Sequence, residues 1–177
     1  MRKIPTLFER DPLDRRHVMP SVTPGCEWVM RGEGRATVKW DGTCVYYDGE
    51  RWWVRREVKP DKTPPRWYWP LQTDPVTGKT VGWEPAEQSG FAKFLHEAAD
   101  GREWGEGTYE LCGPKINGNP DELAVHKLIR HGGLKVVVPD HLSFNSIRDT
   151  VLGMSNEGIV WHHPDGRMAK IKRRDFI

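Results

Sequence analysis

Residues 36–58 read ATVKWDGTCVYYDGERWWVRREV. Apolar and polar residues roughly alternate along this stretch, and the pairs Asp41-Gly42 and Asp48-Gly49 interrupt it. Alternation with a period of two, together with many branched and aromatic side chains, favours β-strands, and an Asp-Gly pair favours a tight turn. The stretch therefore predicts an antiparallel meander, with Lys39 on a strand just before the first turn.

The flanking segments predict a fold that mixes strands with a few helices. Residues 1–25 are rich in Pro, Arg and Asp and are expected to wrap around the body, whereas residues 59–85 hold six prolines and predict a long irregular loop. Helical spacing of Phe91, Phe94, Leu95 and Ala98 predicts a helix over about 86–100 that buries these side chains.

The second half of the chain predicts two more helices among strands. Helix signals are Asn119 followed by Pro120, with a stop at Gly132, and Ser143 before residues 144–152. Strands are expected at 108–112, 134–138, 158–161 and 167–172, the last two forming a hairpin around residues 164–166. The expected fold class is α+β with mainly antiparallel sheets, in a single domain of residues 1–177.

Composition sets broad limits on function. With 27 Lys and Arg against 25 Asp and Glu, any basic surface must be local. The chain has no apolar run of about 20 residues and no signal peptide, so we expect a cytoplasmic protein without membrane contact. Three distant cysteines, without a Cys-x-x-Cys pair, argue against a disulfide framework and a structural zinc site.

Lys39 is the first candidate for chemistry. A lysine is a poor nucleophile while protonated, but neighbouring positive charges lower its pKa. Lys170 and Lys172 could supply that field, and their spacing on a strand sends both side chains to one face, as two cations that bind one phosphate require. Taken alone, a Lys-x-Asp-Gly string is also compatible with an ordinary hairpin turn, and the two lysines with a solvated face.

Four short motifs occur in a fixed order along the chain. They are Lys39-Trp-Asp-Gly42, Tyr109-Glu-Leu111, Glu157-Gly-Ile-Val160 and Lys170-Ile-Lys172. This ordered set resembles the motifs of covalent nucleotidyltransferases, the superfamily of ATP-dependent ligases and mRNA capping enzymes. The longer forms, 39–44 and 113–120, look most like a family of short, single-domain 5′-to-3′ RNA ligases, and the resemblance extends from about residue 15 to the end.

This resemblance implies a nucleotidyltransferase fold, with two mainly antiparallel sheets flanked by helices around an ATP cleft. It also implies a lysyl-AMP intermediate. Lys39 would accept AMP from ATP, AMP would pass to an RNA 5′-phosphate, and a 3′-hydroxyl would then displace it and seal the strand. Glu157 would help to hold Mg²⁺, or Mn²⁺, near the α-phosphate, and Lys170 and Lys172 would contact the phosphate and the intermediate.

The resemblance also implies roles for residues around ATP. Glu110 would hold ribose hydroxyls, Arg55 would contact ribose or the incoming 5′-phosphate, and Val160 would pack on adenine. The expected ATP-binding set is Val38, Asp41, Gly42, Arg55, Glu110, Glu157, Val160, Lys170 and Lys172. Nucleic acid is expected at Arg55, Lys59, Arg173 and Arg174, with solvated faces or ion pairs as the alternative interpretations.

Three other strings are less specific. His162-His163 points to opposite faces of a strand, which disfavours a metal pair, and Thr77-Gly78-Lys79 lacks the loop of a nucleotide-binding P-loop. The run Arg66-Trp67-Tyr68-Trp69 either stacks on single-stranded bases or packs the loop onto the body.

The sequence departs from the superfamily in two places. It stops five residues after Lys172, so no C-terminal oligonucleotide-binding domain is expected, and residues 134–138 offer no aromatic side chain for stacking on adenine. We therefore expect an ATP-dependent RNA ligase whose single domain binds nucleic acid itself or with a partner, and the sequence gives no sign of an obligate protein partner. The alternatives are a small DNA ligase, an enzyme that transfers AMP to another acceptor, and a non-catalytic nucleic-acid binding module.

Overall fold

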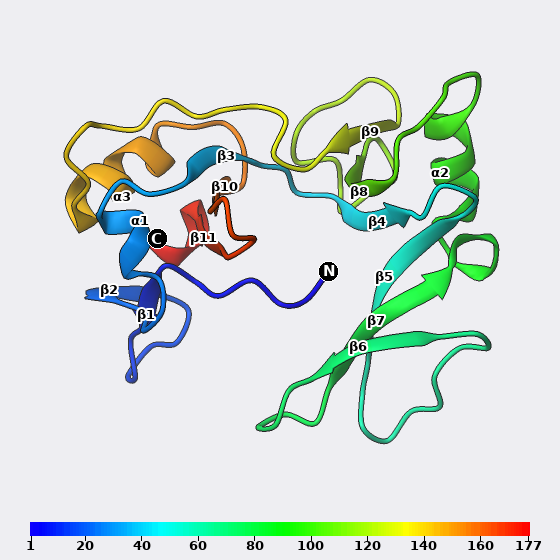
Figure 1. Ribbon diagram of the computed structural model, residues 1–177, viewed down its shortest axis with the longest axis horizontal. Coiled ribbons are helices and arrows are strands. Elements are labelled where there is room, and N and C mark those ends of the chain that lie inside the picture. Colours follow the sequence, from blue (N-terminus) through cyan, green and yellow to red (C-terminus); the bar gives the residue numbers. More distant parts are fainter. The chain divides into compact units, whose positions relative to one another are not determined.

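The computed structural model describes residues 1–177 and divides them into two compact units (Figure 1). Unit 1 contains residues 1–3 and 41–131, and unit 2 contains residues 4–40 and 132–177. Strands in each unit pair antiparallel, and the helices are few, so the predicted α+β class with mainly antiparallel sheets is confirmed. None of the helices combines the length and the apolar character needed to cross a membrane.

Unit 2 is built on a three-stranded sheet with the order β11-β10-β3. One face of this sheet presents Ile159, Trp161 and Ile171 to a core that also holds Trp28 of α1 and Ile147 of α3. The small β1-β2 sheet contributes Phe8 to the same core. The elements are β1 (Phe8–Arg10), β2 (Val18–Val22), α1 (Glu27–Met30), β3 (Arg35–Lys39), α3 (Phe144–Leu152), β10 (Gly158–His162), β11 (Met168–Lys172) and η2 (Arg173–Asp175).

Unit 1 is a six-stranded sheet with the order β6-β7-β5-β4-β8-β9. Its core lies on one face, where Leu95 of α2 packs with Val45, Val54 and Leu111. The elements are β4 (Thr43–Tyr47), β5 (Trp52–Val58), β6 (Trp69–Thr73), β7 (Thr80–Pro85), η1 (Ala86–Gln88), α2 (Ala92–Ala99), β8 (Gly107–Cys112) and β9 (Lys127–Arg130).

Several predicted elements are confirmed. The hairpin around Asp48-Gly49 joins β4 to β5, the strand at 108–112 is β8, and the C-terminal hairpin is β10-β11. Helix α3 begins where Ser143 was expected to cap it, and the Ser143 side chain accepts a hydrogen bond from the Ser146 amide. The predicted 86–100 helix is shorter, because residues 86–88 form a 3₁₀ turn and α2 begins at Ala92, but Leu95 is buried as expected.

The predicted meander over 36–58 is wrong at its first turn. Strand β3 pairs with β10 in unit 2, whereas β4 pairs with β5 and β8 in unit 1. Asp41-Gly42 is therefore a link between sheets and not a hairpin turn. The glycine is needed for a different reason, because a Cβ at Gly42 would lie 2.2 Å from the Leu111 carbonyl oxygen.

The predicted irregular loop over 59–85 is also wrong, because it contains the β6-β7 hairpin. Proline removes a backbone donor and disfavours central strands, yet an edge strand tolerates it. Strand β6 is such an edge, and its pairing with β7 shifts register between Pro70 and Gln72. Outside this hairpin and its turn at 74–79, residues 59–68 form an irregular segment.

Two further predictions between residues 119 and 138 are wrong. Asn119 does not start a helix, because it adopts a left-handed backbone with φ 57° and its side chain bonds to both the amide and the carbonyl of Leu123, which closes a turn. Residues 134–138 do not form a strand. They lie along β3 through a single bridge at Lys135 and backbone hydrogen bonds on either side.

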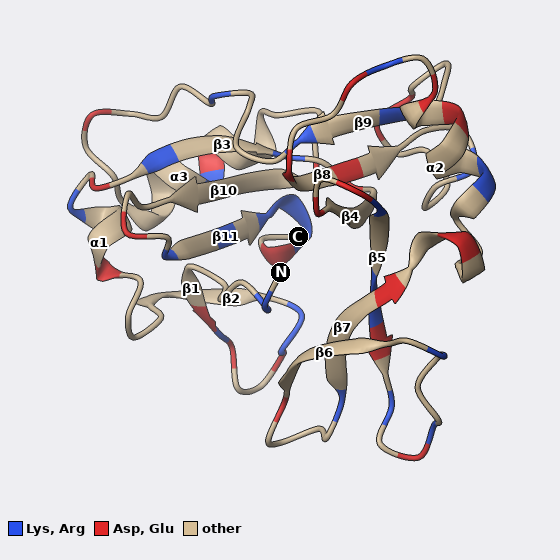
Figure 2. Ribbon diagram, turned by 45° about the vertical axis from the view of Figure 1, so that its right-hand side comes forward, with Lys and Arg blue, Asp and Glu red and all other residues tan.

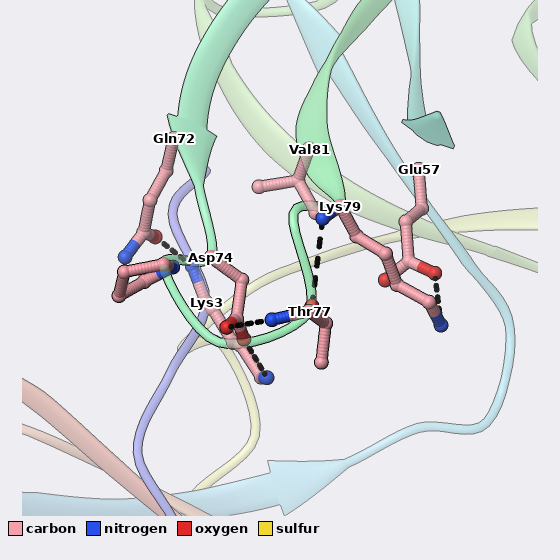
Figure 3. Close-up of a pocket in the computed structure, with 8 residues that line it drawn as sticks. Lys3, Glu57, Gln72, Asp74, Thr77, Lys79 and Val81 are labelled. Atoms are coloured by element: carbon pink, nitrogen blue, oxygen red, sulfur yellow. Dashed lines mark hydrogen bonds and ion pairs between the residues drawn. The ribbon is translucent and has the colours of Figure 1, made fainter. Parts of the chain in front are cut away.

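The turn between β6 and β7 binds the first residues of the chain (Figure 3). The Lys3 amide donates to the Gln72 side chain at 3.1 Å, and Lys3 Nζ lies 3.2 Å from Asp74. Backbone amides of Thr77 and Val76, with help from Lys3, lower the pKa of Asp74 to about 2. The charged side chains of this pocket form ion pairs with one another. The pocket therefore anchors residues 1–3 in unit 1.

Candidate active site

Three strands of unit 2 bring distant charged residues to one face of the sheet. Gly158 on β10 lies opposite Lys39 on β3 and opposite Lys172 on β11. Because side chains alternate across a strand, Lys170 and Val160 share this face. The other face carries the unit 2 core, so the hydrophobic packing that fixes the register also fixes the lysines.

Gly158 allows the strands to meet closely at this point. A Cβ at this position would lie 2.1 Å from the Ile171 carbonyl oxygen and 2.8 Å from Lys172 Cα. No side chain fits there without a shift of the backbone. The glycine therefore holds the lysine-bearing end of β11 against β10.

Glu157 joins the two lysines. Its two carboxylate oxygens accept from Lys39 Nζ and Lys172 Nζ respectively, across 118 residues in the case of Lys39. The side chains of Lys39, Lys172 and Glu157 are 17%, 15% and 9% exposed, so this triad is largely sheltered from solvent. The Glu157 carbonyl also accepts from the Arg173 amide at 2.9 Å, which ties the carboxylate to the end of β11.

The pKa of Glu157 reflects two opposing effects. Burial favours the neutral acid and acts to raise the pKa, but the charge of Lys39 and hydrogen bonds from both lysines outweigh it. The pKa is therefore held below its ordinary value of 4.5. In neutral solution Glu157 is a carboxylate that neutralises part of the positive charge beside it.

This depressed pKa predicts a pH-dependent stability. The ionised carboxylate stabilises the fold above pH 4.5, and this contribution is lost as the pH falls through the lowered native pKa. We expect Glu157→Gln to destabilise unit 2 at pH 7 by on the order of 3 kcal/mol, because it removes one partner from a sheltered ion pair. Urea unfolding at a series of pH values should show this difference shrink below pH 4.5.

The matched control for this prediction is Asp149→Asn, whose carboxylate is 68% exposed in the same unit and should have a small effect. The assignment would be contradicted if the stability difference between the parent and the Glu157→Gln variant stayed constant from neutral pH to well below pH 4.5.

The remaining predicted residues of unit 2 take different positions. Val160 lies between Thr37 and Lys170, and its carbonyl accepts from the Thr37 hydroxyl at 3.1 Å. His162 Nε2 lies 3.0 Å from the same hydroxyl, a neighbour that the sequence did not suggest. Val38 follows the alternation to the opposite face, so its side chain is not directed toward Lys39.

The end of the chain adds a second ion pair beside the triad. Asp175 is buried, accepts from the Lys172 amide at 2.8 Å, and pairs with Arg10 at 2.8 Å. Arg173 and Arg174 lie in η2. Arg174 is exposed, whereas the Nε of Arg173 is buried without a hydrogen-bond partner. A buried donor without an acceptor costs free energy, so an incoming oxygen ligand would be favourable there.

Unit 1 holds Glu110 in a network of its own. Glu110 is 8% exposed. One of its carboxylate oxygens accepts from the Gly42 amide at 3.1 Å, and the other lies 2.7 Å from His131 Nε2. Asn117 donates to Asp41 at 3.3 Å and to the Gly42 carbonyl at 2.8 Å. Two segments that resemble the ligase family, 39–44 and 113–120, thus meet at Asp41-Gly42.

One cluster in unit 1 has side chains that suit a metal ion. The ligand atoms of Cys44, Glu110 and His131 lie within 4.8 Å of one another. Cys44 lies opposite Glu110 in the β4-β8 pairing, whereas His131 follows β9. No local pattern in the sequence pointed to this grouping, because it depends on the β8-β9 register.

Arg55 and Lys59 lie in or beside β5. Arg55 Nε donates to the Met1 carbonyl at 3.1 Å, and its register partner is Trp83. Lys59 follows the end of β5 and is exposed. Neither residue belongs to the same unit as Lys39.

Known proteins with similar sequences share a single description. The family described as RNA ligase 1 matches residues 96–176. RNA ligase 1 of Danio rerio is 40% identical over 76 residues, which cover 38% of this chain and 23% of that protein. RNA ligase 1 of Rattus norvegicus is 27% identical over 213 aligned positions, which cover 78% of this chain and 66% of that protein, and the Mus musculus protein is 28% identical with 78% and 65% covered.

These similarities support an RNA ligase family assignment. The predicted resemblance to an RNA ligase family is therefore confirmed. The matches span less than two thirds of the length of these relatives. The RNA ligase family match includes Glu110, Glu157 and Lys172, whereas Lys39 lies N-terminal to it.

Proposed function

We propose that this chain is an ATP-dependent RNA ligase that works through a lysyl-AMP intermediate on a nucleotidyltransferase fold. The observation that supports this most is the triad of Lys39, Glu157 and Lys172. These residues come from separate motifs, and the register of three strands brings them into contact. Its RNA specificity rests on the family similarity.

The proposed first step is attack of Lys39 Nζ on the α-phosphorus of ATP. A nitrogen–phosphorus bond forms, the bond to the bridging oxygen breaks, and pyrophosphate leaves with the electron pair. The ammonium must lose a proton before the attack, and Glu157 is the carboxylate that already accepts a hydrogen bond from it. Lys170 and Lys172 lie on the same face, where they would bind phosphate oxygens.

Glu157 also fits the role of a magnesium ligand, provided that ATP supplies further oxygen ligands. It is a single sheltered carboxylate, and both of its oxygens accept from lysines. Mg²⁺ is commonly held by one or two carboxylates together with substrate phosphates, so this donor set suits Mg²⁺ or Mn²⁺ once ATP supplies oxygens. The ion would neutralise charge that develops on the phosphate during the transfer.

The other roles remain proposals drawn from the resemblance. Glu110 would contact ribose hydroxyls, Arg55 would contact ribose or the 5′-phosphate, and Val160 would pack on adenine. Val38, Asp41 and Gly42 would contact ATP through the segment around Lys39. Lys59, Arg173 and Arg174 would bind nucleic-acid phosphates, and the AMP would pass from Lys39 to an RNA 5′-phosphate before a 3′-hydroxyl seals the strand.

Intact-protein mass spectrometry after incubation with ATP and Mg²⁺ tests the first step. We expect one added AMP per chain, released when RNA with 5′-phosphate and 3′-hydroxyl ends is supplied, with joined RNA as the product. Absence of the adduct would support a non-catalytic binding module. Transfer of AMP without joining would indicate another acceptor, and equal or better sealing of a matched DNA would indicate a DNA ligase.

A further inference from the structure

Two tryptophans of unit 1 are exposed to solvent. Trp67 precedes β6 and is 69% exposed, and Trp69 begins β6 and is 48% exposed. Tryptophan carries the largest apolar surface of any side chain, so folding would normally cover most of it. Exposed aromatic side chains of this size, close together in the chain, are typical of binding surfaces.

The loop around these tryptophans is fixed in place by other residues. The Tyr68 hydroxyl lies within hydrogen-bond distance of the Arg56 carbonyl, at 2.9 Å, and of the Thr80 carbonyl, at 3.2 Å. Gln88 Nε2 donates to the Arg66 carbonyl at 2.6 Å. Tyr68 therefore attaches the loop to the sheet, and the tryptophans on either side of it are not needed for this attachment.

The backbone at Trp67 is strained. Its φ of 61° lies in the left-handed region, which a bulky residue rarely adopts. Such a conformation costs free energy and persists only where neighbouring contacts impose it, as the bonds of Arg66 and Tyr68 do here. Strain of this kind is common at ligand-binding positions.

Positive charge accompanies the exposed rings. Residues 51–69 hold six Arg and Lys against two Asp and Glu, in a chain whose net charge is only +2. Figure 2 shows basic positions on β5 and along the loop that leads to β6. Two of the arginines lie over indole rings, Arg66 at 4.8 Å from the Trp67 centroid and Arg51 at 5.9 Å from the Trp53 centroid.

Trp53 extends the aromatic surface of Trp69 across the sheet. Its ring meets that of Trp69 edge-on, with centroids 6.0 Å apart, so the aromatic surface continues from β6 onto β5. We call Trp53, Trp67, Trp69, Arg51 and Arg66 the tryptophan platform. It combines flat apolar faces with two guanidinium groups, whereas the ion pairs on the neighbouring strands use other basic side chains.

We propose that the tryptophan platform binds single-stranded RNA, with bases stacked on Trp67 and Trp69 and phosphates held by Arg66 and its basic neighbours. Base faces are available for stacking only where the strand is unpaired, whereas a duplex presents its phosphates and groove edges. The choice of RNA over DNA rests on the proposed function, and the platform would hold an unpaired segment of the RNA to be joined.

Fluorescence anisotropy with a labelled single-stranded RNA oligonucleotide tests this proposal on the full chain. We expect Trp67→Ala and Trp69→Ala each to weaken binding about tenfold, and Trp67→Phe to retain most of the affinity, because an aromatic ring can still stack. The matched control is Val76→Ala, which removes a 91% exposed apolar side chain from the same hairpin and should leave binding unchanged.

Salt dependence separates charge from stacking. Arg66→Ala should reduce the slope of log K against log salt by about 0.7, the value for one phosphate contact on a single strand. Arg102→Ala, at an exposed arginine elsewhere in unit 1, should leave the slope unchanged. A duplex RNA of the same sequence should bind more weakly than the single strand.

The outcomes distinguish this proposal from the ligase proposal. The tryptophan variants should form the AMP adduct as the parent does, since none of the altered residues belongs to the triad. Unchanged RNA affinity in both alanine variants, equal affinity for the duplex, or binding to anionic lipid vesicles in place of RNA would overturn the platform. If the parent forms no adduct but the tryptophan variants still lose RNA binding, the platform would be supported and the ligase proposal rejected.

Discussion

Substituting Lys39 with arginine is expected to abolish the covalent AMP adduct while the fold stays intact. Arginine keeps the positive charge and can still donate to Glu157, so the ion pair that anchors β3 survives. A guanidinium group does not lose its proton in proteins, however, and cannot attack phosphorus. The variant separates a nucleophilic role of Lys39 from a purely electrostatic one.

Intact-protein mass spectrometry with ATP and Mg²⁺ measures this effect, and a thermal melt near that of the parent confirms that the fold survives. Lys135→Arg is the matched control, because Lys135 also lies beside β3 but outside the triad. It should form the adduct normally. An adduct on Lys39→Arg would show that another residue accepts AMP, and the central proposal would then fail.

Substituting Gly158 with alanine should disrupt both the stability of unit 2 and adenylation. The added Cβ would meet the Ile171 carbonyl oxygen at 2.1 Å, where backbone and not a flexible side chain must move. Overpacking of this kind costs about 1–3 kcal/mol or more. Because the same strands position Lys39 and Lys172, the shift would also separate the triad.

Urea unfolding and the rate of AMP-adduct formation test this prediction together. Gly153→Ala is the control, since Gly153 has an ordinary helical backbone and an added Cβ would sit at 3.4 Å from its nearest neighbour. That variant should match or slightly exceed the parent in stability. Adenylation at the parental rate in Gly158→Ala would refute the idea that close strand approach positions the lysines.

The sequence was informative where local chemistry decides the structure. Ser143 caps α3 because its hydroxyl accepts a hydrogen bond from a backbone amide in the first turn of the helix. Asp48-Gly49 forms a hairpin turn because the flanking strands β4 and β5 pair with each other. The alternation in β10 and β11 also correctly placed Lys170 and Lys172 on one face. These features depend on neighbours only a few residues away.

Local patterns failed where distant contacts decide. Asn119-Pro120 has the signature of a helix start, but the Asn119 side chain closes a turn with Leu123. Pro70 suggested a loop, because the sequence does not say that β6 will lie at a sheet edge. The partnership of Lys172 with Glu157, and the place of His131 beside Glu110, likewise follow from strand register.

The pairing of Glu157 with both lysines has a consequence for which anions the site admits. Because Glu157 is fixed to the chain, its carboxylate competes with free anions for the two lysines at an effective concentration of about a millimolar or more. It does so without the entropy loss that a free ion would suffer. Chloride or inorganic phosphate, with few charges, gains little by displacing it. A nucleoside triphosphate carries several charges that bind neighbouring cations together. The Glu157 carboxylate therefore makes the site select polyphosphates over simple salts.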